Sequence, residues 1–197
     1  MADAGPLRLF IAVELPEEIR QILAEVTARL RQQLGGPYRW VPAGNIHLTL
    51  RFLGDVEAGR VGALGEALAG GVRSLTPFTL SLEGTGTFPG GRNPSVVWAG
   101  LGGGIAALTG LRDAVETAMV AVGEGPGVGK FAAHLTLARV RTRLSVGEAG
   151  ELTRLLSEVR YPDGASFEVR GASLIHSSLG PGGPSYATLA HAPLGAI

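Results

Sequence analysis

The residues best suited to chemistry in this chain lie in two identical tetrapeptides. His-Leu-Thr-Leu occupies residues 47–50 and recurs at residues 134–137, 87 positions later. Successive side chains of a β-strand alternate between its two faces, so each histidine would share a face with its threonine while the leucines point the other way. The repeated spacing predicts two strands that bury leucines and present two His–Thr pairs to a shared cleft.

Paired imidazoles and hydroxyls suit acid–base displacement at a phosphate or acyl centre. Imidazole has an ordinary pKa of about 6.5, so one neutral histidine can accept a proton while a protonated one donates. Each such transfer contributes about 10²–10⁴-fold to a rate. Thr49 and Thr136 can donate hydrogen bonds to phosphate oxygens. His176 and His191 have no threonine partner, and we expect them to be structural or exposed.

The apolar pattern places both motifs in the middle strand of a strand–helix–strand–helix–strand unit that occurs twice. The strands are predicted at residues 7–15, 46–53, 78–88, 96–101, 131–140 and 167–178, with an extra one at 186–191. Helical spacing of apolar residues predicts the helices between them; the last starts at Ser145, with Glu148 completing a capping box.

Equivalent strands of the two units are separated by a nearly constant distance in the sequence. The offset favours duplication of one unit, although α/β alternation also occurs without duplication. We expect an α+β, bilobal duplicated fold in which two antiparallel-sheet lobes with outer helices surround a central cleft. We expect one domain over residues 1–197, made of pseudo-symmetric halves at about 7–90 and 95–197.

Composition excludes several classes of function. The 197 residues include 17 Lys+Arg, 17 Asp+Glu and no cysteine. Without cysteine the chain has no disulfide framework, thiolate metal site or cysteine nucleophile. Zero net charge argues against a protein that coats long nucleic acids, but allows recognition of one phosphate by a few local cations. No targeting or membrane segment is visible, so we expect a cytoplasmic protein.

The motifs resemble those of a known family. The sequence is similar to the 2H phosphoesterases, and more narrowly to the RNA 2′,3′-cyclic phosphodiesterases, also called 2′-5′ RNA ligases. The resemblance covers nearly the whole chain, including residues 8–16, both His-x-Thr motifs and the segment 177–186. Ala133 stands where the family often has proline, and residues 182–184 keep its C-terminal pattern only loosely.

The resemblance implies a specific, metal-independent reaction without a cofactor. Members hydrolyse RNA ends bearing a 2′,3′-cyclic phosphate to 2′-phosphates, and can join such ends to a 5′-hydroxyl without ATP. Carried to this chain, His134 is the general base and His47 the general acid that protonates the departing O3′. Thr49 and Thr136 hold phosphate oxygens, and Arg139 contacts the phosphate or the nucleotide.

Three further residues are candidates for substrate binding. Arg139 is five positions after His134, so it faces the cleft only if its strand bends, bulges or ends near Ala138. Arg51 is four positions after His47 and shares its face in an ideal strand. Phe10 could stack on a base, since base–aromatic stacking contributes about 1–3 kcal/mol; burial in the core is the other interpretation.

Two other functions remain open at this point. One is a 2H phosphodiesterase for small cyclic nucleotides or ADP-ribose cyclic phosphate, which the lack of an extended basic surface would favour. The other is an RNA-end binding module without turnover, although binding alone does not require two titratable groups. We expect RNA 3′ ends or small cyclic nucleotides as partners, no metal, no membrane, no obligate protein partner and a monomer.

Overall fold

The computed structural model describes residues 5–91, 93–181 and 183–195. Its strands are β1 (Leu7–Glu14), β2 (Tyr38–Trp40), β3 (His47–Val56), β4 (Phe78–Phe88), β5 (Val96–Gly103), β6 (Leu135–Val140), β7 (Ser166–Val169), β8 (Gly171–Gly180) and β9 (Gly183–Pro193). Its helices are α1 (Glu17–Gln33), α2 (Val61–Val72), α3 (Ile105–Ala121) and α4 (Val146–Glu158), with short 3₁₀ turns η1 (Ala43–Asn45) and η2 (Ala58–Arg60).

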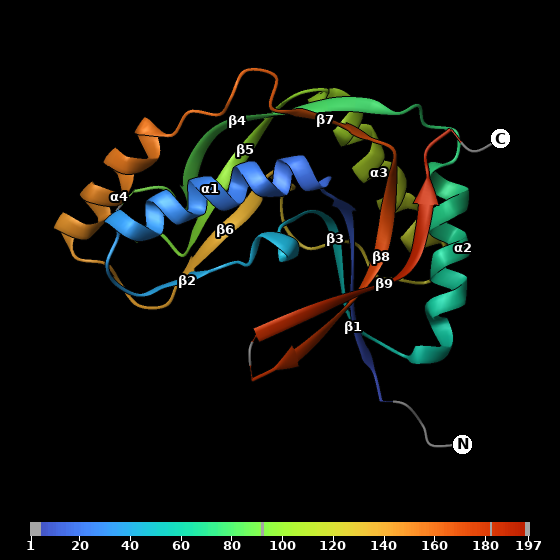
Figure 1. Cartoon of the computed structure of the whole chain (residues 1–197). Helices are drawn as coiled ribbons and strands as arrows, with labels where there is room; N and C mark the ends of the chain where they lie inside the picture. Colours follow the sequence, from blue (N-terminus) through green and yellow to red (C-terminus); the bar gives the residue numbers. More distant parts are fainter. Residues whose placement is uncertain (1–4, 92, 182, 196–197) are drawn as a thin grey trace.

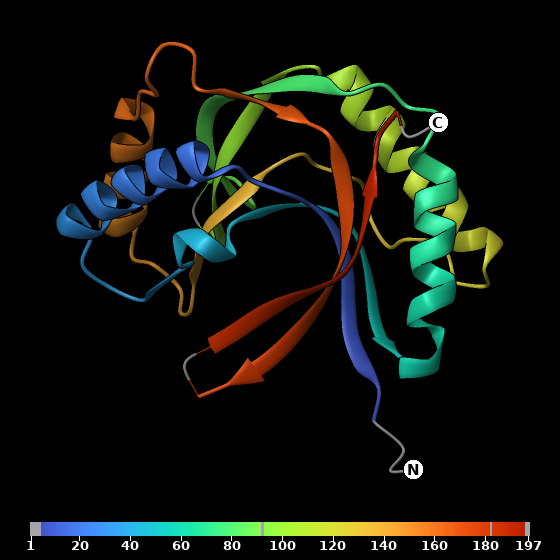
Figure 2. The ribbon, with the colours of Figure 1, turned by 45° about the vertical axis from the view of Figure 1, so that its right-hand side comes forward.

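The strands form two antiparallel sheets. The first has the order β3-β1-β8-β9 and the second the order β2-β6-β5-β4-β7. Figures 1 and 2 show both sheets strongly curved, with α2 and α3 outside the first and α1 and α4 outside the second. The arrangement confirms the predicted α+β fold with two antiparallel sheets and outer helices. None of the helices in the described ranges is long and apolar enough to cross a bilayer.

Helical periodicity correctly identified the packing faces of the helices. In α1 the buried residues are Ile19, Leu23, Val26 and Leu30, the four that recur at helical spacing in the sequence. Burying an aliphatic side chain of this size contributes about 1.5–3 kcal/mol. At the start of α4, the Ser145 hydroxyl accepts from the Glu148 backbone N–H and the Glu148 carboxylate accepts from the Ser145 N–H, so the capping box is present.

The first sheet has one face against the helices and one face that carries the first motif. From β1, Leu9, Ile11 and Val13 enter the main core with the helices. Phe10 and Ala12 point the other way and form a small second cluster with Ile175 of β8. Ala12 is the register partner of Thr49 in β3. We call the side of each sheet that carries its His–Thr pair the motif face.

The strands of the structure depart from the prediction in three main ways. The strand predicted at 131–140 begins only at Leu135, so His134 lies just before it. The single strand predicted at 167–178 is two strands, since β7 pairs with β4 in the second sheet and β8 pairs with β1 in the first. Between them the chain passes Arg170 and enters β8 at Gly171, where a Cβ would lie 2.6 Å from the His191 ring. The short strand β2 was missed because three residues carry no recognisable alternation.

The sheets do not correspond to the two sequence halves at 7–90 and 95–197. The first two predicted strands of each unit pair with each other in both halves, since β1 pairs with β3 and β5 pairs with β6. The third strand of each unit is exchanged: β4 of the first half joins β5, and β8 of the second half joins β1. Each sheet is therefore completed by the other half of the chain.

Candidate active site

The two His–Thr pairs come from strands that lie against each other. His47 is the first residue of β3 and His134 immediately precedes β6, and β3 and β6 are in contact although they belong to different sheets. His134 is near enough for its charge to lower the pKa of His47. Leu48, Leu50, Leu135 and Leu137 are all buried, as the alternation predicted.

Both imidazoles are held by the same backbone contact. His47 Nδ1 lies 2.9 Å from the carbonyl oxygen of Asn45, and His134 Nδ1 lies 2.7 Å from that of Ala132. A carbonyl can only accept, so Nδ1 carries the hydrogen in each ring and donates it to the residue two positions earlier. Nε2 is then the nitrogen left to exchange protons with a substrate in both histidines.

Aromatic rings pack around each imidazole. The His47 ring centroid is 4.6 Å from that of Phe10 and 5.2 Å from that of Tyr186, which meets it edge-on. The His134 ring is 5.0 Å from Phe88, also edge-on. Phe10 is only 3% exposed. The expectation that Phe10 stacks on a base is therefore wrong, and Phe10 follows the other interpretation, burial. Its ring packs against the imidazole of His47.

A β-bulge in β6 brings Arg139 to the motif face. Trp98 of β5 is opposite Thr136, and the next pair joins Val97 to Ala138, so Leu137 is an extra residue in β6. The inserted residue reverses the alternation beyond it. Ala138 is buried, and Arg139 is exposed on the same face as Thr136.

The equivalent bulge in β3 turns Arg51 away. Ala12 of β1 is opposite Thr49 and Ile11 is opposite Arg51, so Leu50 is the extra residue. Arg51 consequently lies on the core side, and its residue is 6% exposed. Its guanidinium forms an ion pair of 2.9 Å with Glu116 of α3 and donates to the carbonyls of Glu116 and Gly125. Substrate binding by Arg51 is therefore an incorrect expectation; the residue joins β3 to α3.

Phe52 takes the position on the motif face that the alternation assigned to Arg51. It is opposite Phe10 of β1, with ring centroids 6.1 Å apart, and it is 66% exposed. Sequence reasoning missed it because an ideal strand without the bulge points Phe52 into the core. An exposed aromatic ring beside the motif is a suitable surface for a nucleobase.

A hydrogen-bonded group of side chains lies beside His47 on the same face. Glu14 of β1 is the register partner of His47. Its carboxylate accepts from the hydroxyls of Ser173, at 2.6 Å, and Thr188, at 3.0 Å. Because the single Ser173 proton goes to Glu14, His191 Nδ1, 2.9 Å from Ser173 Oγ, donates to that oxygen. His191 is exposed, as expected, and it also belongs to this hydrogen-bonded group through Ser173.

Burial, hydrogen bonding and neighbouring charges all change the pKa of His47, and they do not all change it in the same direction. Burial lowers the pKa of His47 because a charged imidazolium loses hydration, and its bond to the Asn45 carbonyl raises it. Interactions with His134 and with the Arg139 guanidinium lower the pKa of His47 further, while the Glu14 carboxylate raises it. Burial therefore favours neutral His47, and a bound anion would favour its protonated form.

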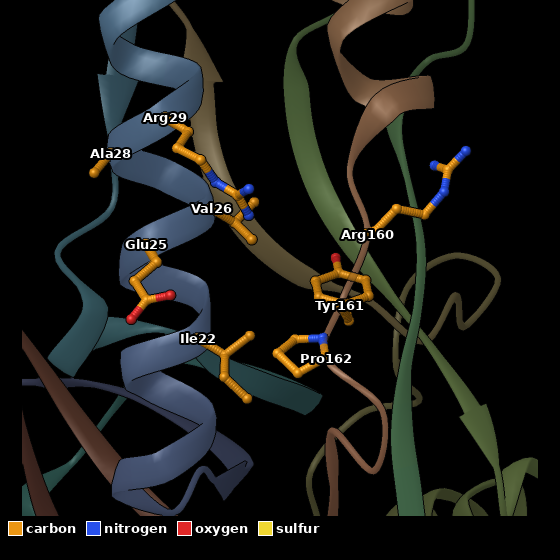
Figure 3. A pocket seen from close by; sticks show the side chains of 8 residues that line it. All are labelled: Ile22, Glu25, Val26, Ala28, Arg29, Arg160, Tyr161 and Pro162. Carbon is orange, nitrogen blue, oxygen red and sulfur yellow. The ribbon is translucent and has the colours of Figure 1, made fainter.

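A groove elsewhere on the molecule has a different character. Ile22 and Val26 of α1 face Tyr161 and Pro162 across it, as Figure 3 shows. Burial raises the pKa of Tyr161 to about 12, and its hydroxyl donates to the Gly84 carbonyl. The residues that line this groove include neither motif. Among the described residues no group of three or more His, Asp or Glu side chains is placed to hold a metal ion.

Comparisons with known proteins agree with this geometry. A family model described as LigT like Phosphoesterase matches residues 13–98. An RNA 2′,3′-cyclic phosphodiesterase of Aeropyrum pernix is 38% identical over 165 residues, 82% of this chain and 91% of that protein. One of Thermus thermophilus is 37% identical over 193 residues, 93% of this chain and 88% of that protein.

Solved structures show the same fold. The crystal structure of Escherichia coli LigT in its apo form has a TM-score of 0.74 and 30% identity, covering 97% of this chain and 99% of that one. The same protein complexed with 3′-AMP has a TM-score of 0.73 at 30% identity, with 96% and 98% covered. With its two His-x-Thr strands, its two curved sheets and these relatives, the chain belongs to the LigT-like phosphoesterases of the 2H family.

Proposed function

We propose that this protein hydrolyses the 2′,3′-cyclic phosphate at the 3′ end of RNA to a 2′-phosphomonoester. The observation that carries the proposal is the matched pair of imidazoles, each held through Nδ1 by a backbone carbonyl so that Nε2 is free to exchange a proton. The name RNA 2′,3′-cyclic phosphodiesterase, borne by the relatives, supports the substrate class.

The proposed step is an in-line displacement by water. His134 Nε2 accepts a proton from the water as its oxygen bonds to phosphorus. The bond from phosphorus to O3′ breaks, and His47 Nε2 gives its proton to O3′. The products are a 2′-phosphate and a free 3′-hydroxyl, and the two imidazoles exchange protonation states. Two such proton transfers contribute about 10²–10⁴-fold each, and neither requires a metal ion or a cofactor.

Burial lowers the pKa of His47, and a neighbouring carboxylate opposes this effect. Glu14 on the neighbouring strand raises the pKa of His47 and so favours the form that can donate. The anionic substrate phosphate would act in the same direction once it binds. In this proposal Thr49 and Thr136 donate hydrogen bonds to the non-bridging oxygens. Arg139 supplies a positive charge on the same face and would contact the phosphate or the nucleotide of the substrate.

Ligation follows from the same chemistry. If the 5′-hydroxyl of another RNA takes the place of water, the identical transfers join the two chains through a 2′-5′ linkage without ATP. Cleavage of that linkage is the reverse step, in which His47 becomes the base and His134 the acid, as microscopic reversibility requires.

The deciding experiment supplies the protein, in EDTA, with RNA oligonucleotides ending in a 2′,3′-cyclic phosphate and, in parallel, with 2′,3′-cyclic mononucleotides. We expect a 2′-phosphomonoester, identified by its resistance to an enzyme specific for 3′-phosphates. No turnover of any compound would exclude the enzyme. Release of a 3′-phosphate would mean that O2′ leaves, and loss of activity in EDTA that is restored by a divalent cation would exclude the metal-independent step. Exclusive turnover of mononucleotides would favour the small-molecule alternative.

A further inference from the structure

Two arginines face each other directly across the edge of the second sheet. Arg39 of β2 is the register partner of Arg139 of β6. Side chains in directly opposite positions of an antiparallel pair have Cβ atoms about 4.5–5.5 Å apart, where like charges repel. Among the ion pairs formed within residues 5–91, 93–181 and 183–195, none includes Arg39 or Arg139. The pair is a place where an anion would relieve repulsion.

The Arg39 side chain reaches across to the other sheet. A Cβ added to Gly183, at the start of β9, would lie 2.7 Å from Arg39 Nη2, so the guanidinium rests directly against this glycine. Gly183 has a φ of +111°, a conformation that side chains with a Cβ rarely adopt. The Asn45 side-chain amide also donates to the neighbouring Pro184 carbonyl, at 2.8 Å, which anchors the β8–β9 hairpin beside the first motif.

A third arginine, Arg8, and a tyrosine, Tyr186, lie near the pair Arg39 and Arg139. Arg8, Arg39 and Arg139 all lie near enough to Tyr186 to lower its pKa, against the larger effect of burial, which raises it. Tyr186 itself packs edge-on against His47. The three guanidiniums therefore gather around a tyrosine that contacts His47, although the net charge of the protein is zero.

We propose that Arg39 and Arg139 form a second phosphate subsite, which binds the phosphodiester that joins the terminal nucleotide of the substrate to its 5′ neighbour. This inference rests on the proposed function and names a second part of the RNA end, beyond the reacting nucleotide, that the protein binds. A cyclic mononucleotide has no such phosphodiester and leaves the repulsion between the two guanidiniums unrelieved. A planar guanidinium with several donors is suited to hold a phosphate in two hydrogen bonds.

The test compares three substrates that share one reacting end. They are uridine 2′,3′-cyclic phosphate, the uridine dinucleotide ending in the same cyclic phosphate, and that dinucleotide with a neutral methylphosphonate in place of its phosphodiester. Because hydrogen bonds to charged groups contribute about 1.5–3 kcal/mol, we expect kcat/KM to favour the charged dinucleotide over both others by about tenfold or more. The neutral dinucleotide separates the charge from any stacking of the second base.

The variants assign this preference to Arg39. Arg39→Ala should reduce the ratio of charged to neutral dinucleotide to near one, Arg39→Lys should keep part of it, and Arg73→Ala, an equal charge change at the end of α2, should keep all of it. Equal loss on the charged and neutral dinucleotides in Arg39→Ala would overturn the subsite, as would a wild-type protein that does not distinguish them.

Binding separates failure of the subsite from failure of the proposed function. The charged and neutral dinucleotides, each ending in a 2′-phosphate and labelled at the 5′ end, are titrated at several salt concentrations. Loss of one phosphate contact on a single strand should reduce the slope of log K against log salt by about 0.7, both in Arg39→Ala and with the neutral dinucleotide. If the wild type shows this difference but hydrolyses nothing, the subsite stands and the proposed hydrolysis falls. Equal slopes for both ligands would exclude the subsite even in an active enzyme.

Discussion

Phe52 and Arg139 occupy equivalent positions, each five residues after the histidine of its motif and each on the motif face of a bulged strand. The bulges at Leu50 and Leu137 fall at the same place in the two motifs. One motif therefore continues with an exposed aromatic ring and the other with a cation, which match the two recognisable parts of a nucleotide, its base and its phosphate.

Replacement of either motif histidine should nearly abolish activity. His47→Ala and His134→Ala each remove one proton transfer, so we expect kcat to fall at least about 10²-fold with the cyclic phosphate substrates. His176→Ala is the matched control, because His176 is opposite Leu9 on the helix side of the first sheet. Near-normal activity of either motif variant would contradict the paired mechanism, provided that circular dichroism shows the variant to be folded.

Replacement of Glu14 should identify which histidine is the acid. Glu14→Gln removes a charge that raises the pKa of His47, so that pKa should decrease. If His47 is the acid, its deprotonation limits the rate at high pH, and the alkaline limb of the kcat/KM profile should move to lower pH. Movement of the acidic limb instead would make His47 the base. Ser178→Ala, an exposed hydroxyl change on β8, should leave both limbs in place.

The ion pair between Arg51 and Glu116 should matter for stability. Arg51→Ala removes the closer cation of Glu116, which keeps only the longer 3.8 Å pair with Arg112, so the loss should approach the cost of breaking a buried pair, about 3–5 kcal/mol of unfolding free energy. The double variant Arg51→Leu, Glu116→Leu should recover much of that loss in urea unfolding. Arg154→Ala, which removes two exposed pairs on α4, with Glu151 and with Glu158, should reduce stability far less. A selective increase in KM with unchanged stability would return Arg51 to substrate binding.

Replacement of Phe52 should weaken nucleotide binding without unfolding the protein. Stacking on a base contributes about 1–3 kcal/mol, so Phe52→Ala should reduce kcat/KM about fivefold or more, mainly through KM. Phe52→Tyr should retain the activity. Val146→Ala, at another exposed apolar residue, is the control. If Phe52→Ala lowers the melting temperature but leaves KM unchanged, the ring serves packing against Phe10 instead.

Alternation and helical periodicity were enough to predict most elements and the face that each motif buries. The four buried positions of α1, the bounds of β4 and the buried motif leucines follow from apolar spacing alone. These predictions hold because each depends on a single element and on the face that it buries. The same rule failed for Arg51, because one inserted residue reverses every following side chain.

Contacts between distant segments account for what the sequence could not predict. The position of Arg39 opposite Arg139 depends on the pairing of β2 with β6. The sequence does not indicate this pairing, because a strand of three residues has no detectable periodicity. Glu14, Ser173 and Thr188 come from three strands whose order in the sheet is not readable from their spacing. The burial of Phe10 depends on Tyr186 and Ile175, which lie more than half the chain away.

The exchange of β4 and β8 between the sheets has a consequence for how such a molecule can be divided. In a fragment of residues 7–90, β1 and β3 pair with each other, whereas β4 belongs to the other sheet. The pair β1–β3 therefore has an edge at β1 that β8 covers in the whole protein. Residues 95–197 supply β8, which pairs with β1. They also supply β5, which pairs with β4 of the first half. Strand exchange of this kind is known between the subunits of domain-swapped dimers, and here it occurs within one chain. Each sheet contains strands from both parts of the chain, so pairing between distant segments fixes the strands that carry the two motif histidines relative to each other.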